Sequence, residues 1–176
     1  MSRTLRFIPV LLIAIAAHAA TLQQLSMDQM NQLATSVVRA RVTGLSADFA
    51  ATPGSPMIYT HYKLAVSEVW KGAAATEVLL PGGDVQGVKQ SFPGVPELHV
   101  GSEYILFLWK SPSTGIVHTL GLTQGIFEIS TAADGSVVAN RKQSGELMLD
   151  ASGHRISDRA VGMKLADLKS RVRVSK

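Results

Sequence analysis

The stretch 59-YTHYKLAVSEVWKGA-73 decides the fold, because apolar and polar residues alternate along most of its length. Such alternation is typical of a β-strand that lays one face against a core and turns the other toward solvent. Placing Tyr62, Leu64 and Val66 inward leaves Val69 out of step, since strict alternation cannot put Val66 and Val69 on one face without a bulge. The stretch therefore predicts a long, bent strand.

Shorter runs of the same kind lie on either side and predict further strands, for roughly six or seven in all. They are 36-SVVRARVTGL-45, 77-EVLLP-81, 103-EYILFLW-109, 115-GIVHTLGL-122, 125-GIFEIS-130 and 135-GSVVAN-140. The step Ala133–Gly135 predicts a tight hairpin turn. No helical crossover lies between the strands, so the sheet is expected to be antiparallel. The fold class predicted is mainly β, an antiparallel OB-like barrel.

One short helix is expected at each end of this β region. Ser26 and Gln29 have the spacing of a capping box, followed by an apolar stripe that includes Met30. At the other end, Leu165 and Leu168 recur at helical spacing. These elements predict a single OB-like domain over residues 20–176, with a short N-terminal helix and a C-terminal helix.

Residues 1–19 have the features of a secretory signal peptide. Basic residues come first, Phe7 to Ala17 is an apolar run, and Ala17-His18-Ala19 ends it with small residues around one variable position. This run is shorter than the roughly 20 apolar residues that a membrane-spanning helix needs. We expect cleavage after Ala19, and hence a secreted or periplasmic protein with no transmembrane segment in the mature chain.

The composition excludes several kinds of chemistry. The chain has no cysteine, so thiol catalysis, thiolate metal sites and disulfides are absent. It has 17 basic and 13 acidic residues; without Arg3 and Arg6 of the signal, the excess of positive charge falls to two. A balance this small does not favour a nucleic-acid partner, which would show a clustered basic face.

No catalytic, metal or cofactor motif is complete. The segment 121-GLTQG-125 has threonine where a nucleophile elbow has serine, and it lies between two strands. The histidines that follow the signal lack ligand spacing, although two strands can bring distant histidines together. The loop 81-PGGDVQG-87 lacks the lysine and strand-to-helix setting of a phosphate-binding loop. No cofactor and no metal are therefore predicted, and the protein is expected not to be an enzyme.

Three separated segments, in order, carry a resemblance to a known family. They are 35-TSVVRARVTG-44, 58-IYTHYKLAVSEVWKG-72 and 100-VGSEYILFLWKSPSTGIVHTLG-121. Together they resemble the N-terminal domain of the tissue inhibitors of metalloproteinases and the related netrin-type modules. The chain also resembles secreted bacterial proteins that share the pattern VWKG…PGG…GSEYILFL. The resemblance implies a five-stranded OB-type barrel with packed helices. The family's inhibitors use a mature N-terminal cysteine, which this chain lacks.

Two regions are candidates for ligand binding. Tyr59, His61 and Lys63 share the outward face of the long strand, where they could stack on and hydrogen-bond a sugar or a peptide, or simply be solvated. Gly82 and Gly83 begin the Gly- and Pro-rich segment 81–101, either a functional loop or a crossing at the barrel end.

A basic C-terminal region, Lys164 to Lys176, fits either an anionic partner or compensation of a helix dipole.

The function expected from the sequence is that of an exported, non-catalytic binding or interaction module. Its ligand would be a protein or a carbohydrate. Two alternatives stay open. The first is an inhibitor of an extracellular peptidase, by analogy of fold. The second is a small hydrolase without a recognisable motif.

Overall fold

The structure, a computed structural model, describes residues 21–50, 56–144 and 146–174, with side chains as far as Val172. The predicted signal peptide, residues 1–19, lies outside the described residues. In chain order the elements are β1 (Thr21–Gln23), α1 (Met27–Leu33), β2 (Ser36–Phe49), β3 (Ile58–Lys71), β4 (Glu77–Pro81), β5 (Gly83–Val85), β6 (Val88–Gln90), β7 (Glu103–Lys110), β8 (Val117–Thr119), η1 (Leu122–Gly125), β9 (Ile126–Thr131), β10 (Val137–Arg141), β11 (Leu147–Leu149), β12 (Arg155–Ile156), β13 (Val161–Lys164) and α2 (Leu165–Val174).

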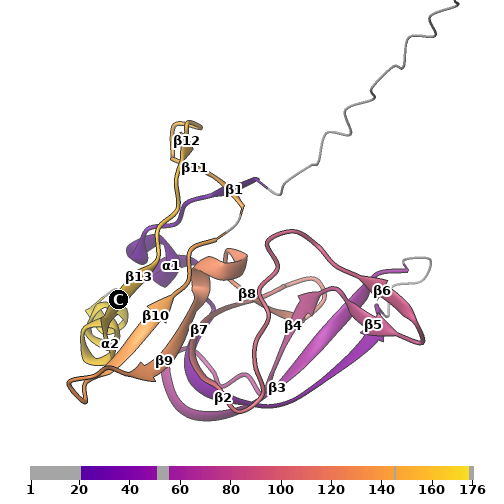
Figure 1. The fold of residues 1–176 in the computed structure, drawn as a ribbon, viewed down its shortest axis with the longest axis horizontal. Helices are drawn as coiled ribbons and strands as arrows, with labels where there is room; N and C mark the ends of the chain where they lie inside the picture. The colour runs from indigo at the N-terminus through magenta and orange to yellow at the C-terminus, as the bar shows by residue number, and fades with distance from the viewer. Residues whose placement is uncertain (1–20, 51–55, 145, 175–176) are drawn as a thin grey trace, which may run out of the picture.

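Most strands belong to one antiparallel sheet of the order β13-β10-β9-β7-β2-β3-β4, with β8 paired to β7 (Figure 1). The mainly β, antiparallel prediction is confirmed for this sheet. A separate small sheet contains β1 and β11, which run parallel. Most of the domain lies between β1 and β11 in the sequence. It supplies the long connection that a parallel pair of strands requires.

The large sheet is not a closed barrel, which corrects that part of the predicted fold. Its hydrogen-bonded path ends at β4 and β13, and among the described strands no ladder joins β4 to β8. Instead, the side chain of His118 on β8 contacts the carbonyl oxygen of Leu79 on β4, at 3.1 Å from Nδ1. β4 ends at Pro81, which has no N–H to donate, and Gly82 turns the chain away at φ 101°.

The long strand β3 contains the predicted bulge. Arg39 pairs with Glu68 and Ala40 with Val66, so the register skips Ser67, whose hydroxyl donates to the Arg39 carbonyl oxygen at 3.3 Å. Such an extra residue bends the strand and strengthens its twist. It also changes which face the following residues occupy: Val66 packs against one core, whereas Trp70, four residues on, packs against the core on the opposite face.

Two apolar cores lie on opposite faces of the sheet. One contains Val38 and Leu106 and is covered by the curved β2-β3-β4 region and the buried Leu98. The other contains Phe107 and Phe127 and is covered by the two helices. The strand β7 is buried on both faces, which explains why its sequence is almost continuously apolar.

Both predicted helices are present. At α1 the capping box is complete: Ser26 Oγ accepts from the backbone N–H of Gln29, and the Gln29 side chain accepts from the backbone N–H of Ser26. In α2, Leu168 and Val172 are buried in the second core. In Figure 1 the two helices lie at one end of the molecule, and the β5–β6 hairpin lies at the other.

The segment 81–101 is more regular than predicted. It contains the β5–β6 hairpin, which turns at Gln86 and Gly87, both with positive φ. Its second half has no regular structure but places Leu98 in the core. Between strands β9 and β10, the predicted Asp134-Gly135 turn is present and closes with a hydrogen bond from Ala132 N to Ser136 O.

Candidate functional site

A groove of about 720 Å³ crosses the outward side of β3 and β4, where β8 and the ends of β2 and β7 border it. This volume is within the range of small-molecule pockets. We call it the aromatic groove, because its walls include Phe49, Tyr59, His61, Trp109 and His118.

The register of β3 explains why its residues line this groove. Tyr59 is paired with Pro81 and His61 with Leu79, without a register shift between them. Tyr62, which directly follows His61, is buried in the core, as is Leu64 two residues further on. Alternation therefore turns Tyr59 and His61 to the outward side, where they meet Leu79 of β4.

The rings of three residues stand in sequence along the groove. The centroid of the His118 ring lies 6.2 Å from that of Tyr59, with the planes tilted by 48°. It lies 6.5 Å from that of Trp109, with the planes only 23° apart. These separations are within the range of aromatic pairs. Trp109 remains 39% exposed, so a large apolar ring is available to a ligand.

Each imidazole of the groove has one nitrogen occupied. Nδ1 of His118 contacts the Leu79 carbonyl oxygen, which can only accept, so Nδ1 carries the proton. Nδ1 of His61 lies 3.3 Å from Oε2 of Glu77, another acceptor. In the neutral rings Nε2 is then the remaining acceptor, and a ligand hydroxyl can donate to it.

The structure brings together some of the sequence-predicted residues and separates others. Tyr59 and His61 line the aromatic groove, but Lys63, although exposed on the same strand, does not. Gly82 and Gly83 lie at the corner between β4 and β5. There a Cβ on Gly83 would be 2.8 Å from Thr60 Oγ1, so this glycine is required by close packing.

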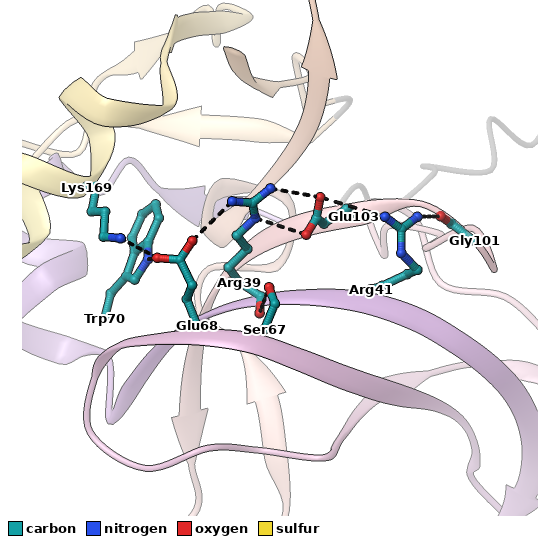
Figure 2. A network of polar contacts seen from close by, with 8 residues as sticks. All are labelled: Arg39, Arg41, Ser67, Glu68, Trp70, Gly101, Glu103 and Lys169. Carbon is teal, nitrogen blue, oxygen red and sulfur yellow. Dashed lines mark hydrogen bonds and ion pairs between the residues drawn. The ribbon is translucent and has the colours of Figure 1, made fainter. Parts of the chain in front are cut away.

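A second cluster of polar residues lies between the sheet and α2 (Figure 2). Arg39 binds Glu103 through two nitrogens, at 2.9 and 3.1 Å, and Glu68 at 3.1 Å. Glu68 also accepts from Lys169, whose ammonium lies 5.6 Å from the Trp70 ring centroid. We call these five residues the charged network.

The charged network is better explained as structural than as a binding site. The hydrogen bond from Lys169, with those from Trp70 and Arg39, lowers the pKa of Glu68 to about 2. Hydrogen bonding to Glu103 raises the pKa of Arg39. Because each of these charges already faces an opposite one, the network holds α2 on the sheet and leaves little charge for a partner. Lys169, part of the predicted basic region, is thus engaged within the molecule.

A third cluster is buried near η1. Glu146 is only 8% exposed, and its carboxyl group interacts with the Thr123 hydroxyl and with its own backbone N–H, neither at ordinary hydrogen-bond geometry. Burial, with the nearby negative charge of Asp158, raises the pKa of Glu146. Thr123, the central residue of 121-GLTQG-125, is also buried at its hydroxyl and lies in a 3-10 helix, so it is not exposed as a nucleophile would be.

The described residues contain no group of three or more His, Asp or Glu side chains that could hold a metal ion. None of the helices in the described ranges is long and apolar enough to cross a membrane. The chain matches no model of a known protein family and no curated protein.

Trp109 and His118 were not among the sequence-predicted site residues. They are directly paired across the β7–β8 hairpin, which places them side by side. The sequence did contain a signal: the short connection 111–116 between two strands predicts a hairpin, and a hairpin pairs residues symmetrically about its turn. That pairing alone does not reveal that β8 approaches β4, which completes the groove.

Proposed function

We propose that this chain is an exported, non-catalytic binding module whose aromatic groove binds a carbohydrate. The observation that carries the proposal is the exposed Trp109 ring, flanked by His118 and Tyr59. The apolar face of a sugar ring packs on an exposed aromatic ring, because this contact removes apolar surface from water. The imidazoles and nearby hydroxyls then supply the hydrogen bonds that orient the sugar.

The charges of the groove favour a sugar over a nucleic acid. Asp48 lines the groove, and the carboxylate of Glu77 lies beside His61. Carboxylates repel the phosphates that nucleic-acid sites attract with Lys and Arg. A neutral or weakly charged ligand rich in hydroxyls meets no such penalty.

Export and an OB-like ancestry are part of the same proposal. The N-terminal pattern of residues 1–19 supports export. The strong curvature of β2-β3-β4 and the contact of His118 with Leu79 support a relation to OB-type barrels, which are partly open and bind oligosaccharides on one side. The relation to OB-type barrels rests on analogy of fold.

The test is a glycan array probed with the mature chain, residues 20–176, followed by titration of each retained glycan. We expect binding to quench or shift the fluorescence of Trp109. Trp109→Ala should weaken binding at least about tenfold, which corresponds to about 1.4 kcal/mol. The matched control is Phe92→Ala, which removes an aromatic ring of similar exposure outside the groove. Failure of every glycan to bind, or equal loss in the two variants, would contradict the proposal.

One observation favours a second function, inhibition of an extracellular peptidase. β1 begins one residue after the predicted mature start, Ala20, and is fixed to the fold. Gln124 accepts from Leu25 N at 2.7 Å and donates to Gln23 O at 3.0 Å. A segment anchored this close to the predicted mature start is suited to presenting a free α-amine to a peptidase cleft.

Inhibition is tested with a panel of metallo- and serine peptidases and two forms of the protein. One form begins at Ala20, and the other carries a single additional glycine before it. Inhibition by the first form alone would support this function. Equal behaviour of the two forms would exclude a role for the terminal amine.

A further inference from the structure

The aromatic groove continues into a second cavity of about 500 Å³. The two share Leu79 on one wall and Thr114 and Ile116 on the other. Both therefore lie along the same line, the seam where β4 approaches β8. We call the second cavity the seam cavity.

The sequence explains why the seam cavity is open. One wall is the outward side of β4 together with the connection from Ala73 to Thr76, where three successive alanines leave room. Before them, Gly72 has φ 68°, and a Cβ there would be 2.1 Å from Thr35 O. This tight turn carries the small residues past the sheet edge without filling the space beside it.

We infer that the aromatic groove and the seam cavity form one binding surface, which takes an oligosaccharide lying as a chain along the β4–β8 seam. The inference rests on the proposed carbohydrate function and adds the class of carbohydrate. Each cavity alone is large enough for a small ligand, so a single sugar would leave one of them unfilled.

The two halves offer complementary contacts. In the aromatic groove the rings of Tyr59 and Trp109 provide surfaces for stacking. The seam cavity has no aromatic side chain and is lined instead by Lys110 and by small and hydroxyl-bearing residues such as Thr76. The Lys110 ammonium has no hydrogen-bond or ion-pair partner in the described part of the chain, so its donors are free for ligand hydroxyls.

A polar pair connects the halves. His61 belongs to the aromatic groove and Glu77 to the seam cavity, yet their side chains are only 3.3 Å apart. A sugar unit at this junction would meet a carboxylate acceptor on one side and an imidazole on the other. Hydroxyls of the sugar unit at this junction would therefore have a polar partner in each half.

Calorimetric titration with a length series tests the inference. The probes are glucose, N-acetylglucosamine and mannose, each as the monomer and as oligomers of two to six units. We expect affinity to rise with length until the seam is filled, with the hexamer of the recognised series binding at least about tenfold more tightly than its monomer.

Ala74→Trp separates the two cavities. Ala74 is exposed and lines the seam cavity but not the aromatic groove. This variant should reduce hexamer affinity to that of the monomer and leave monomer binding unchanged. Lys110→Ala should reduce hexamer binding in the same direction. The matched control is Ala133→Trp, which places the same ring at the exposed β9–β10 turn.

The outcomes distinguish the two proposals. A monomer that binds as tightly as its hexamer, or a hexamer unaffected by Ala74→Trp, would overturn the chain inference and leave the carbohydrate function standing. No binding by any probe, together with an empty glycan array, would overturn both. Loss of monomer binding in Ala74→Trp would show that the cavities are not separate halves and would also overturn the inference.

Discussion

At the scale of single residues, Glu146 and Asp158 show how burial and hydrogen bonding together shift the pKa values of two nearby carboxyl groups in opposite directions. Burial opposes ionisation of Asp158, but hydrogen bonds from Arg141 and from Ser144 N outweigh it and lower the pKa of Asp158. For Glu146, burial outweighs hydrogen bonding from its own backbone N–H and from the Thr123 hydroxyl, so its pKa is raised. Burial and hydrogen bonding therefore shift the pKa values of these two carboxyl groups in opposite directions.

Replacing Glu146 by glutamine is expected to stabilise the protein at neutral pH. The raised folded-state pKa of Glu146 means that its contribution to stability is present below about 4.5, its ordinary value, and is lost as the pH rises through the folded value. Glu146→Gln removes this loss, so we expect a gain on the order of 1 kcal/mol at pH 7.

The measurement is urea unfolding at pH 7 and at pH 4, where the gain should largely disappear. Glu97→Gln is the control, because Glu97 is exposed on the neighbouring loop. A Glu146→Gln variant that is destabilised at pH 7 would show that the buried carboxylate is ionised and bound by a partner.

At the scale of elements, the sequence predicted what depends on neighbouring residues. The capping box of α1 and the Asp134-Gly135 turn are formed by residues a few positions apart, and both are present. The bulge in β3 followed from the misfit of Val66 and Val69. The pairing of β1 with β11 and the approach of β8 to β4 join distant segments, and no local pattern encodes them. For the same reason Tyr59 and His61 could be proposed from alternation, while Trp109 could not be assigned to their groove.

The docking of α2 is expected to depend on Glu68. Its carboxylate joins Arg39 of β2 and Lys169 of α2 (Figure 2). Glu68→Gln should raise amide hydrogen exchange in α2 and cost about 1 kcal/mol at neutral pH, since partial exposure screens the charges. With a folded pKa near 2, the wild-type contribution is present above about pH 4.5 and is lost as the pH falls toward 2.

Glu128→Gln provides the matched control for this variant. Glu128 pairs at 3.4 Å with Lys142, a residue that is largely exposed, and the pair does not involve α2. It should leave exchange in α2 unchanged. Unaltered exchange in Glu68→Gln would instead mean that apolar contacts of Leu168 and Val172 hold the helix alone.

At the scale of the whole molecule, the ion pair of Arg141 and Asp158 connects the large sheet to the segment that includes the small one. Arg141 ends β10, and Asp158 lies between β12 and β13. Their contact is bidentate, with both distances 2.8 Å, and both side chains are buried. Asp158 also accepts from Ser144 N at 2.7 Å, so three segments meet at one carboxylate.

Removing only one member of this pair leaves a buried charge without compensation, and Asp158→Ala should therefore cost about 3–5 kcal/mol in urea unfolding. The double variant Arg141→Met, Asp158→Leu removes both charges and should recover most of that loss, because the desolvation cost disappears with them.

Hydrogen exchange then shows whether the pair holds the two sheets together or contributes only to global stability. If the pair holds the sheets together, Asp158→Ala accelerates exchange in β11 and β12 before it affects β7, which is buried on both faces. A uniform acceleration across all strands would show that the two sheets unfold as one unit, and that the pair contributes to global stability without controlling their attachment.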